Sequence, residues 1–187
     1  MVKLDKIYTR GGDGGETSLG DGSRVAKYSL RVHAQGDIDE TNAMIGLARR
    51  FADPETTDAV LSRIQNDLFD LGADVTRPGD DHTDGNLRIQ PGQVDRLEAE
   101  IDEANENLEP LRSFVLRGGT DFAASLHLAC TVCRRAERVL TALSAEEPIN
   151  THGRKYLNRL SDLLFVMARA ANDDGKTDVL WKPGQNT

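Results

Sequence analysis

The chain has 187 residues and a formal net charge of −8 at pH 7. That length fits one domain with a substantial core, and the acidic balance argues against nucleic acid or an anionic membrane as the main partner. No apolar run approaches the roughly 18 residues of a membrane span, and no secretory leader is visible at the start. Two cysteines make no disulfide framework, so we expect a cytoplasmic protein.

The N-terminal segment is rich in glycine, which accounts for six of the fourteen residues from 9 to 22. Glycine allows positive φ and close approach of the backbone, and successive N–H groups in such turns can form a nest for an anion. Hydroxyl and cationic side chains accompany it: Thr9, Arg10, Thr17, Ser18 and Lys27. A phosphate cradle and a flexible tail are equally compatible with this composition. The segment is neither a Walker A loop nor a dinucleotide fingerprint.

Five segments have the apolar spacing of amphipathic helices. We expect helices at about residues 37–51, 53–75, 93–108, 121–143 and 149–172. Asp37 is the expected cap of the first helix, and Asp53 followed by Pro54 is a typical start for the second. Stripes with this spacing pack against one another as in helix bundles. The sequence therefore predicts an all-α five-helix bundle, and no run indicates a sheet.

The connections divide a single domain into three parts. We expect a glycine-rich segment at 1–36, the helical bundle at 37–172 and a C-terminal tail at 173–187. The stretch 76–90 has the composition of a mobile connection. Apolar residues 114–116 precede paired glycines, and we expect this loop to pack against other residues. The apolar residues 179–181 of the tail are expected to dock.

Two arginines on the fourth helix could carry chemistry. Arg134 and Arg138 are one turn apart and project together, and paired guanidinium groups suit a polyanion such as a triphosphate. A solvated charged face is the alternative, which the helix by itself favours. Asn158 on the fifth helix could bind a base or ribose, or could pair two helices. Cys130 and Cys133 lie in mid-helix, where a redox role is unsupported, and Cys133 is expected to be buried as a small apolar residue.

Metal and hydrolase chemistry have little support in the sequence. The four histidines show no ligand-like pairing with each other or with the cysteines, so no structural zinc is expected. They are His33, His82, His127 and His152. No nucleophile-elbow motif occurs.

Taken together, these motifs resemble the PduO-type ATP:cob(I)alamin adenosyltransferases over nearly the whole chain. The stretches that carry the resemblance are residues 6–10 with the glycine segment, 36–40, 65–69, 114–120, 133–138 and 156–165. The resemblance implies a five-helix bundle that forms a homotrimer with active sites between subunits. It also implies transfer of the 5′-deoxyadenosyl group of ATP to the cobalt of cob(I)alamin, with Mg²⁺, giving adenosylcobalamin and triphosphate. Partners implied are a flavin-type reductase and an adenosylcobalamin-dependent enzyme.

The resemblance also assigns site residues. Phe114 would lie against the lower face of the corrinoid, and Arg134 and Arg138 would act with it in catalysis. The residues implied for ATP are Thr9, Arg10, Gly11, Gly12, Thr17, Ser18, Lys27, Arg134, Arg135, Ala136, Glu137, Arg138 and Asn158.

Two positions depart from the family's usual pattern. Four residues before Arg134 the family usually has an arginine that pairs across the subunit interface with the position of Asp39, and here that residue is Cys130. Before the paired glycines the family usually has proline, and here it is Arg117. A non-catalytic trimer that carries or senses nucleotide or corrinoid is the competing interpretation, because Asp39 lacks its usual partner.

Overall fold

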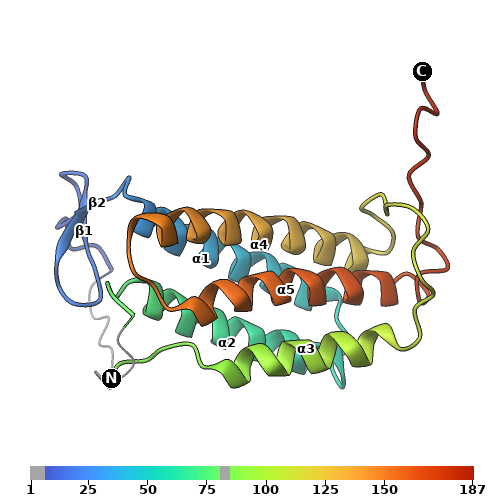
Figure 1. Cartoon of the computed structure of the whole chain (residues 1–187), viewed down its shortest axis with the longest axis horizontal. Helices are drawn as coiled ribbons and strands as arrows, with labels where there is room; N and C mark the ends of the chain where they lie inside the picture. Colours follow the sequence, from blue (N-terminus) through green and yellow to red (C-terminus); the bar gives the residue numbers. More distant parts are fainter. Residues whose placement is uncertain (1–6, 81–84) are drawn as a thin grey trace.

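A computed structural model describes residues 7–80 and 85–187 of the chain. It is a bundle of five helices with a two-stranded hairpin at one end (Figure 1). The helices are α1 Leu30–Ala48, α2 Thr57–Val75, α3 Pro91–Asn105, α4 Asp121–Glu146 and α5 Thr151–Ala170, with a short 3₁₀ turn, η1, at Arg49–Phe51. The predicted five-helix bundle is confirmed.

The hairpin was not expected from the sequence. Strands β1 Glu16–Ser18 and β2 Arg24–Ala26 pair in antiparallel fashion, with Thr17 opposite Val25. Strands of three residues are too short to show an alternating pattern. Their connection is fixed by Asp21, whose carboxylate accepts hydrogen bonds from the backbone N–H and the hydroxyl of Ser23. Part of the glycine-rich segment is therefore ordered.

The first helix begins earlier than predicted, at Leu30 and not at Asp37. Ser29 caps it, because its hydroxyl accepts a hydrogen bond from the N–H of Val32. Asp37 lies inside the helix and is buried. Polar residues interrupt the apolar spacing in the first turns of α1, so periodicity alone does not indicate a helix there.

The other helix ends lie within a few residues of the prediction. α2 begins at Thr57 because Asp53 forms a separate turn, in which its carboxylate accepts from the N–H groups of Glu55 and Thr56. The hydroxyl of Thr120 caps α4, and the side chain of Asn150 caps α5. Local side-chain bonds of this kind satisfy N–H groups that a helix start leaves unpaired.

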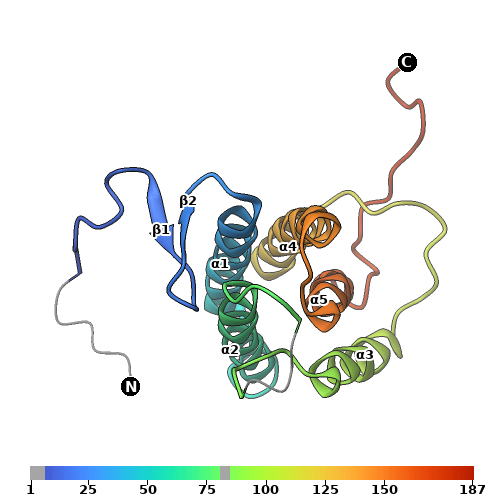
Figure 2. The ribbon, with the colours of Figure 1, turned by 60° about the vertical axis from the view of Figure 1, so that its left-hand side comes forward.

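The core lies between α1, α4 and α5. α1 packs along α4, α4 packs along α5, and α2 and α3 cover α1 and α5 respectively (Figure 2). Leucine, isoleucine and alanine side chains from the predicted stripes fill this core. No helix in the described ranges is both long enough and apolar enough to span a bilayer.

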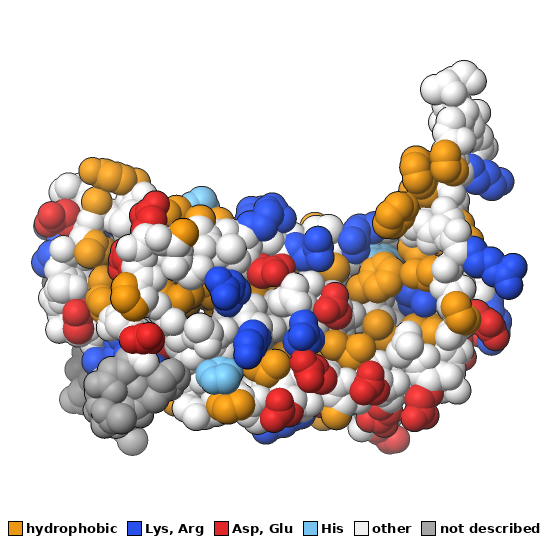
Figure 3. Space-filling view, in the orientation of Figure 1, with side chains coloured by type: hydrophobic (Ala, Val, Ile, Leu, Met, Phe, Trp, Pro, Cys, Tyr) orange, Lys and Arg blue, Asp and Glu red, His pale blue; other side chains and the backbone are white. Residues whose placement is uncertain are grey.

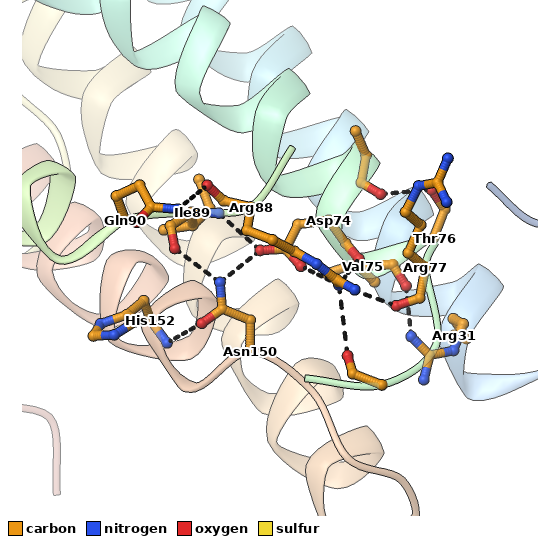
Figure 4. Close-up of polar contacts among 12 residues, drawn as sticks. Arg31, Asp74, Val75, Thr76, Arg77, Arg88, Ile89, Gln90, Asn150 and His152 are labelled. Carbon is orange, nitrogen blue, oxygen red and sulfur yellow. Dashed lines mark hydrogen bonds and ion pairs between the residues drawn. The ribbon is translucent and has the colours of Figure 1, made fainter. Parts of the chain in front are cut away.

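A buried polar network holds one end of the bundle together (Figure 4). The carboxylate of Asp74, near the end of α2, accepts hydrogen bonds from Arg88 Nη1 at 2.9 Å and from the N–H of Ile89 at 2.8 Å. It also accepts from Asn150 Nδ2 at 2.7 Å, just before α5. Three segments that are distant in sequence therefore meet at one carboxylate, which fixes the end of α2.

Candidate functional site

The glycine-rich segment folds back over its own lysine. Arg10 and Gly15 have left-handed backbones, with φ of 62° and 86°, and the Gly15 carbonyl accepts a 2.8 Å hydrogen bond from the N–H of Lys27. A Cβ at Gly12 would lie only 2.8 Å from Lys27 Nζ. Glycine at this position therefore lets the ammonium group approach the loop backbone, where an anion could be bound.

Arg24 stabilises the same loop, although no motif in the sequence indicates a role for it. Its Nη2 donates to the Gly11 carbonyl at 2.7 Å, and its Nη1 donates to Ser18 Oγ at 3.3 Å. Its position opposite Ser18 in the hairpin explains the contact. Thr9 lies beside Gly11, because a Cβ there would be 3.7 Å from Thr9 Oγ1. The segment thus brings several predicted nucleotide-binding residues together.

The segment is anchored at the end of the bundle. The N–H of Gly20 donates a 2.9 Å hydrogen bond to the carbonyl of Thr76, which follows α2. A Cβ at Gly20 would lie 3.1 Å from both Thr76 and Arg77 side-chain atoms. In Figure 2 the hairpin lies outside α1, on the side away from α4 and α5. The network around Asp74 therefore supports the point at which the segment docks.

The predicted arginines lie on an exposed face of α4. Arg138 Nη1 donates a 3.1 Å hydrogen bond to the carbonyl of Arg134, and both side chains are exposed. Neither forms an ion pair with an acidic residue in the described part of the chain. Basic side chains gather over α4 and α5 in the space-filling view, whereas acidic ones are frequent along α3 (Figure 3). This face has unpaired positive charge on an acidic protein.

The resemblance assigns two further α4 residues to ATP, but within the chain these residues contact α1 or the core. Arg135 Nε lies 3.3 Å from Asp37 Oδ1, and its Nη2 pairs with Glu40. It therefore joins α4 to α1 within the chain. Ala136 is fully buried in the core and offers no side-chain surface to a ligand.

Asn158 and Glu137 form a fixed pair between α5 and α4. Asn158 Nδ2 donates to Glu137 Oε1 at 2.9 Å, and Asn158 Oδ1 accepts from Arg159 Nη1 at 2.6 Å. Both ends of the amide are engaged, so its orientation is set. This pair joins the two helices one turn from Arg134.

A cavity of about 520 Å³ with aromatic walls lies at the end of the bundle opposite the β1–β2 hairpin (Figure 1). We call it the Phe114 cavity, and its lining is Leu111, Arg112, Ser113, Phe114, Val115, Arg117, Phe165 and Trp181. Phe114 is 76% exposed, which core packing does not explain. An exposed aromatic ring on the wall of a cavity is typical of a binding surface.

The C-terminal tail holds the Phe114 loop in place. Val115 bridges to Leu180, and the N–H of Trp181 donates a 2.8 Å hydrogen bond to the Phe114 carbonyl. The hydroxyl of Ser113 donates to the Trp181 carbonyl at 2.7 Å. The expectations that this apolar loop packs and that the tail docks are both confirmed, and the two segments pack against each other.

The second of the paired glycines after this loop is required by a close contact. Gly119 has φ of 111°, and a Cβ there would lie 2.0 Å from Asn172 Oδ1. That oxygen accepts a 3.1 Å hydrogen bond from the N–H of Thr120, while Asn172 Nδ2 donates to the Gly118 carbonyl. The end of α5 therefore sets the position at which the loop enters α4.

The two residues that depart from the family pattern, Arg117 and Cys130, contact each other. Arg117 Nη1 lies 3.6 Å from the Sγ of Cys130, and that thiol donates to the Ser161 carbonyl. Asp39 is exposed on the side of α1 that faces α2, near Asn42 and Phe69. Within one chain the Asp39 carboxylate is exposed, so cysteine at position 130 leaves no buried, unpaired charge there.

The cysteines and the histidines at 33, 127 and 152, which lie in the described ranges, are not grouped as metal ligands. Cys133 is fully buried, as predicted, and burial raises the pKa of both the Cys130 and the Cys133 thiols. Within residues 7–80 and 85–187, no group of three or more His, Cys, Asp or Glu side chains could hold a metal ion. His82 lies outside the described residues. A cavity of about 760 Å³ between α2, α3 and α5 contains none of the predicted site residues.

Comparisons with known proteins find relatives that match over nearly the whole chain. The sequence profile of the cobalamin adenosyltransferase family matches residues 7–171. A corrinoid adenosyltransferase of Mycobacterium tuberculosis is 51% identical over 98% of this chain and 96% of its own length. A cobalamin adenosyltransferase of Cupriavidus metallidurans is 50% identical over 96% of each. A variant of the PduO-type ATP:corrinoid adenosyltransferase from Lactobacillus reuteri, solved with cobalamin and ATP, aligns with a TM-score of 0.88 at 36% identity, over 95% of this chain and 97% of that one.

Proposed function

The chain belongs to the cobalamin adenosyltransferase family and is a corrinoid adenosyltransferase, and we propose which of its residues hold the two substrates. The glycine-rich segment with Lys27 and the α4 face with Arg134 and Arg138 bind the triphosphate of ATP. The Phe114 cavity binds the corrinoid. The observation that carries this proposal is unpaired positive charge beside the ordered glycine loop and along α4, on a chain of net charge −8.

The reaction explains why no side-chain nucleophile is needed. The cobalt of cob(I)alamin is itself the nucleophile, and its electron pair forms the bond to the 5′ carbon of ATP. The bond from that carbon to the triphosphate oxygen breaks, and triphosphate leaves with the electron pair. The protein has to orient the two reactants and to stabilise the charge that develops on the departing oxygen.

Arg134 and Arg138 suit that task because they are cations on one exposed face of a helix, and Lys27 suits it because its ammonium group lies against the glycine loop. Preorganised donors stabilise a developing anion without reorganising during the reaction. Asn158, held by Glu137, is suited to the ribose or base. Mg²⁺ is commonly bound through one or two carboxylates and substrate phosphates, so we propose that it enters on the phosphates of ATP.

We propose that the active unit is a homotrimer with shared sites. Within one chain the hairpin lies outside α1 (Figures 1 and 2), whereas Arg134 lies near the middle of the α4 sequence. A neighbouring copy would bring its glycine-rich segment onto this α4 face. Exposed aromatic residues near the segment support such an interface, since Tyr28 is 91% exposed and Phe69 is 69% exposed.

The substrate chemistry also calls for two partners. Cobalt has to be reduced to the cob(I) state before transfer, which a flavin-type reductase would do. The product serves an adenosylcobalamin-dependent enzyme. The competing hypothesis of a non-catalytic carrier or sensor rested on Cys130, and it finds no support in the 51% identity to a corrinoid adenosyltransferase.

The test is anaerobic incubation of the protein with chemically reduced cobalamin and MgATP. We expect the absorbance spectrum of adenosylcobalamin to appear, with release of one triphosphate for each molecule formed. Samples without ATP, and samples with Arg134→Ala, are the controls. Release of ADP or of phosphate and diphosphate in place of triphosphate would contradict the proposed displacement.

A further inference from the structure

Arg117 is held on the wall of the Phe114 cavity by three contacts. Its Nη1 lies 3.4 Å from His127 Nδ1 and 3.6 Å from Cys130 Sγ. Its guanidinium carbon lies 5.8 Å from the centre of the Phe165 ring. Arginine stacks readily on aromatic faces and keeps its charge there. The guanidinium is therefore positioned although the residue is exposed.

None of these contacts neutralises the arginine. A guanidinium is always a donor, so His127 Nδ1 accepts, and burial together with the charge of Arg117 lowers the pKa of this imidazole. Burial raises the pKa of the Cys130 thiol. Both partners are thus neutral at pH 7. Among the residues that the structure describes, no acidic side chain forms an ion pair with Arg117.

A second arginine lies on the same cavity. Arg112 lines it and is exposed, and no described acidic residue pairs with it either. The remaining lining includes the rings of Phe114, Phe165 and Trp181. Two unpaired guanidinium groups beside aromatic rings suit a ligand that combines an apolar surface with an anionic oxygen.

We propose that Arg117, assisted by Arg112, binds the phosphodiester in the nucleotide tail of the corrinoid substrate. This inference rests on the proposed function, in which Phe114 lies against the lower face of the corrin ring. The peripheral side chains of cobalamin are neutral amides, and its anionic group is the phosphodiester of the tail. The tail hangs from the lower face, so a ring in that place displaces it toward the cavity wall. The planar fork of an arginine matches two phosphate oxygens.

The consequence is selectivity among corrinoids. Cobinamide has the corrin ring and the amides of cobalamin but lacks the nucleotide tail. It keeps every contact to Phe114 and loses the contact to Arg117. The chain should therefore prefer cobalamin, and the preference should depend on Arg117.

The experiment compares the two corrinoids in the wild-type protein, Arg117→Gln, Arg112→Gln and a matched control, Arg96→Gln, on the exposed face of α3. Initial rates are measured anaerobically with saturating MgATP and chemically reduced cob(I)alamin or cob(I)inamide. Loss of one charge-assisted contact should raise the KM for cob(I)alamin by about tenfold in Arg117→Gln. The KM for cob(I)inamide and both kcat values should stay within about twofold of wild type, as should all values for Arg96→Gln.

A second measurement needs only the wild-type protein. Added salt should raise the KM for cob(I)alamin more than that for cob(I)inamide, because salt screens an exposed phosphate–arginine pair.

Three outcomes of the variant experiment would overturn the inference. They are an equal rise of both corrinoid KM values in Arg117→Gln, no rise in either, and a rise only in the KM for ATP. If wild type transfers to neither corrinoid, the proposed function itself fails, and the inference fails with it.

Discussion

The N–H of Trp181 donates a 2.8 Å hydrogen bond to the carbonyl of Phe114, and the rings of the two residues lie 6.0 Å apart. The C-terminal tail therefore positions the aromatic residue that we assign to the corrinoid. Because this contact joins residues that are distant in the chain, it gives the tail a function that can be tested.

Trp181→Ala should weaken corrinoid binding and leave ATP binding unchanged. The backbone hydrogen bond can persist, but the ring contact is lost, and such aromatic pairs contribute about 0.5–1.5 kcal/mol. We expect the KM for cob(I)alamin to rise by about two- to tenfold. Lys182→Ala, on the exposed residue that follows, is the control. A change in the KM for ATP alone would contradict the role assigned to the tail.

Phe114→Ala should impair reduction of cob(II)alamin more than adenosyl transfer. An apolar ring below the corrin excludes the lower axial ligand, and loss of that ligand makes reduction easier. Chemically prepared cob(I)alamin has already shed most of that ligand. Activity with an enzymatic reductase is compared with activity under a strong chemical reductant. Equal losses in the two assays would remove this role from Phe114.

Arg134→Ala and Arg138→Ala should each lower kcat by about two orders of magnitude, since removal of one preorganised donor typically costs about 2.7–4 kcal/mol. The helix should persist, because alanine is a good helix former. Arg135→Ala is the matched comparison on the next position. Its guanidinium pairs with Asp37 and Glu40, so its loss should change kcat far less. Wild-type turnover in a folded Arg134→Ala protein would show that the triphosphate assignment is wrong.

Asp74→Asn should destabilise the fold, because it removes the charge with which the buried Arg88 forms an ion pair at 2.9 Å. Loss of one member of a buried pair costs about 3–5 kcal/mol. Asp58→Asn is the control, since Asp58 pairs with Arg49 at a partly exposed site, where solvent screening leaves an ion pair little net effect on stability. Urea unfolding at one protein concentration measures both. Similar midpoints for the two variants would show that the network around Asp74 is not a stabilising element.

The helices could be predicted because their apolar stripes are local. Leu61, Ile64, Leu68 and Leu71 recur with helical spacing, and all four are buried on α2. The start of α1 could not be predicted in the same way. Its buried Arg31 is satisfied by the Val75 carbonyl and by Glu147, and these partners lie far away in the sequence. A local pattern contains no information about such contacts.

The site could be predicted only in part for the same reason. The glycines, Arg134 and Phe114 are recognisable as residue types in motifs. The bracing of the loop by Arg24 depends on a short hairpin, and the position of Arg117 depends on how the loop meets α4. Arg135 and Ala136 lie in the same motif as Arg134, yet helix geometry directs them toward α1 and the core.

The central claim is that one ATP site is built from two copies of the chain, and mixing two inactive variants tests it most directly. Lys27→Ala removes the cation of the glycine-rich segment, and Arg134→Ala removes the cation of α4. Light scattering should first show a mass of three chains for each variant. The variants are then unfolded and refolded together in equal amounts, with wild type treated in the same way as the reference. Random assembly of shared sites should restore about a quarter of the wild-type activity, because one site in four combines an intact segment with an intact α4 face. Mixed trimers with no more activity than the separate variants would contradict a shared site.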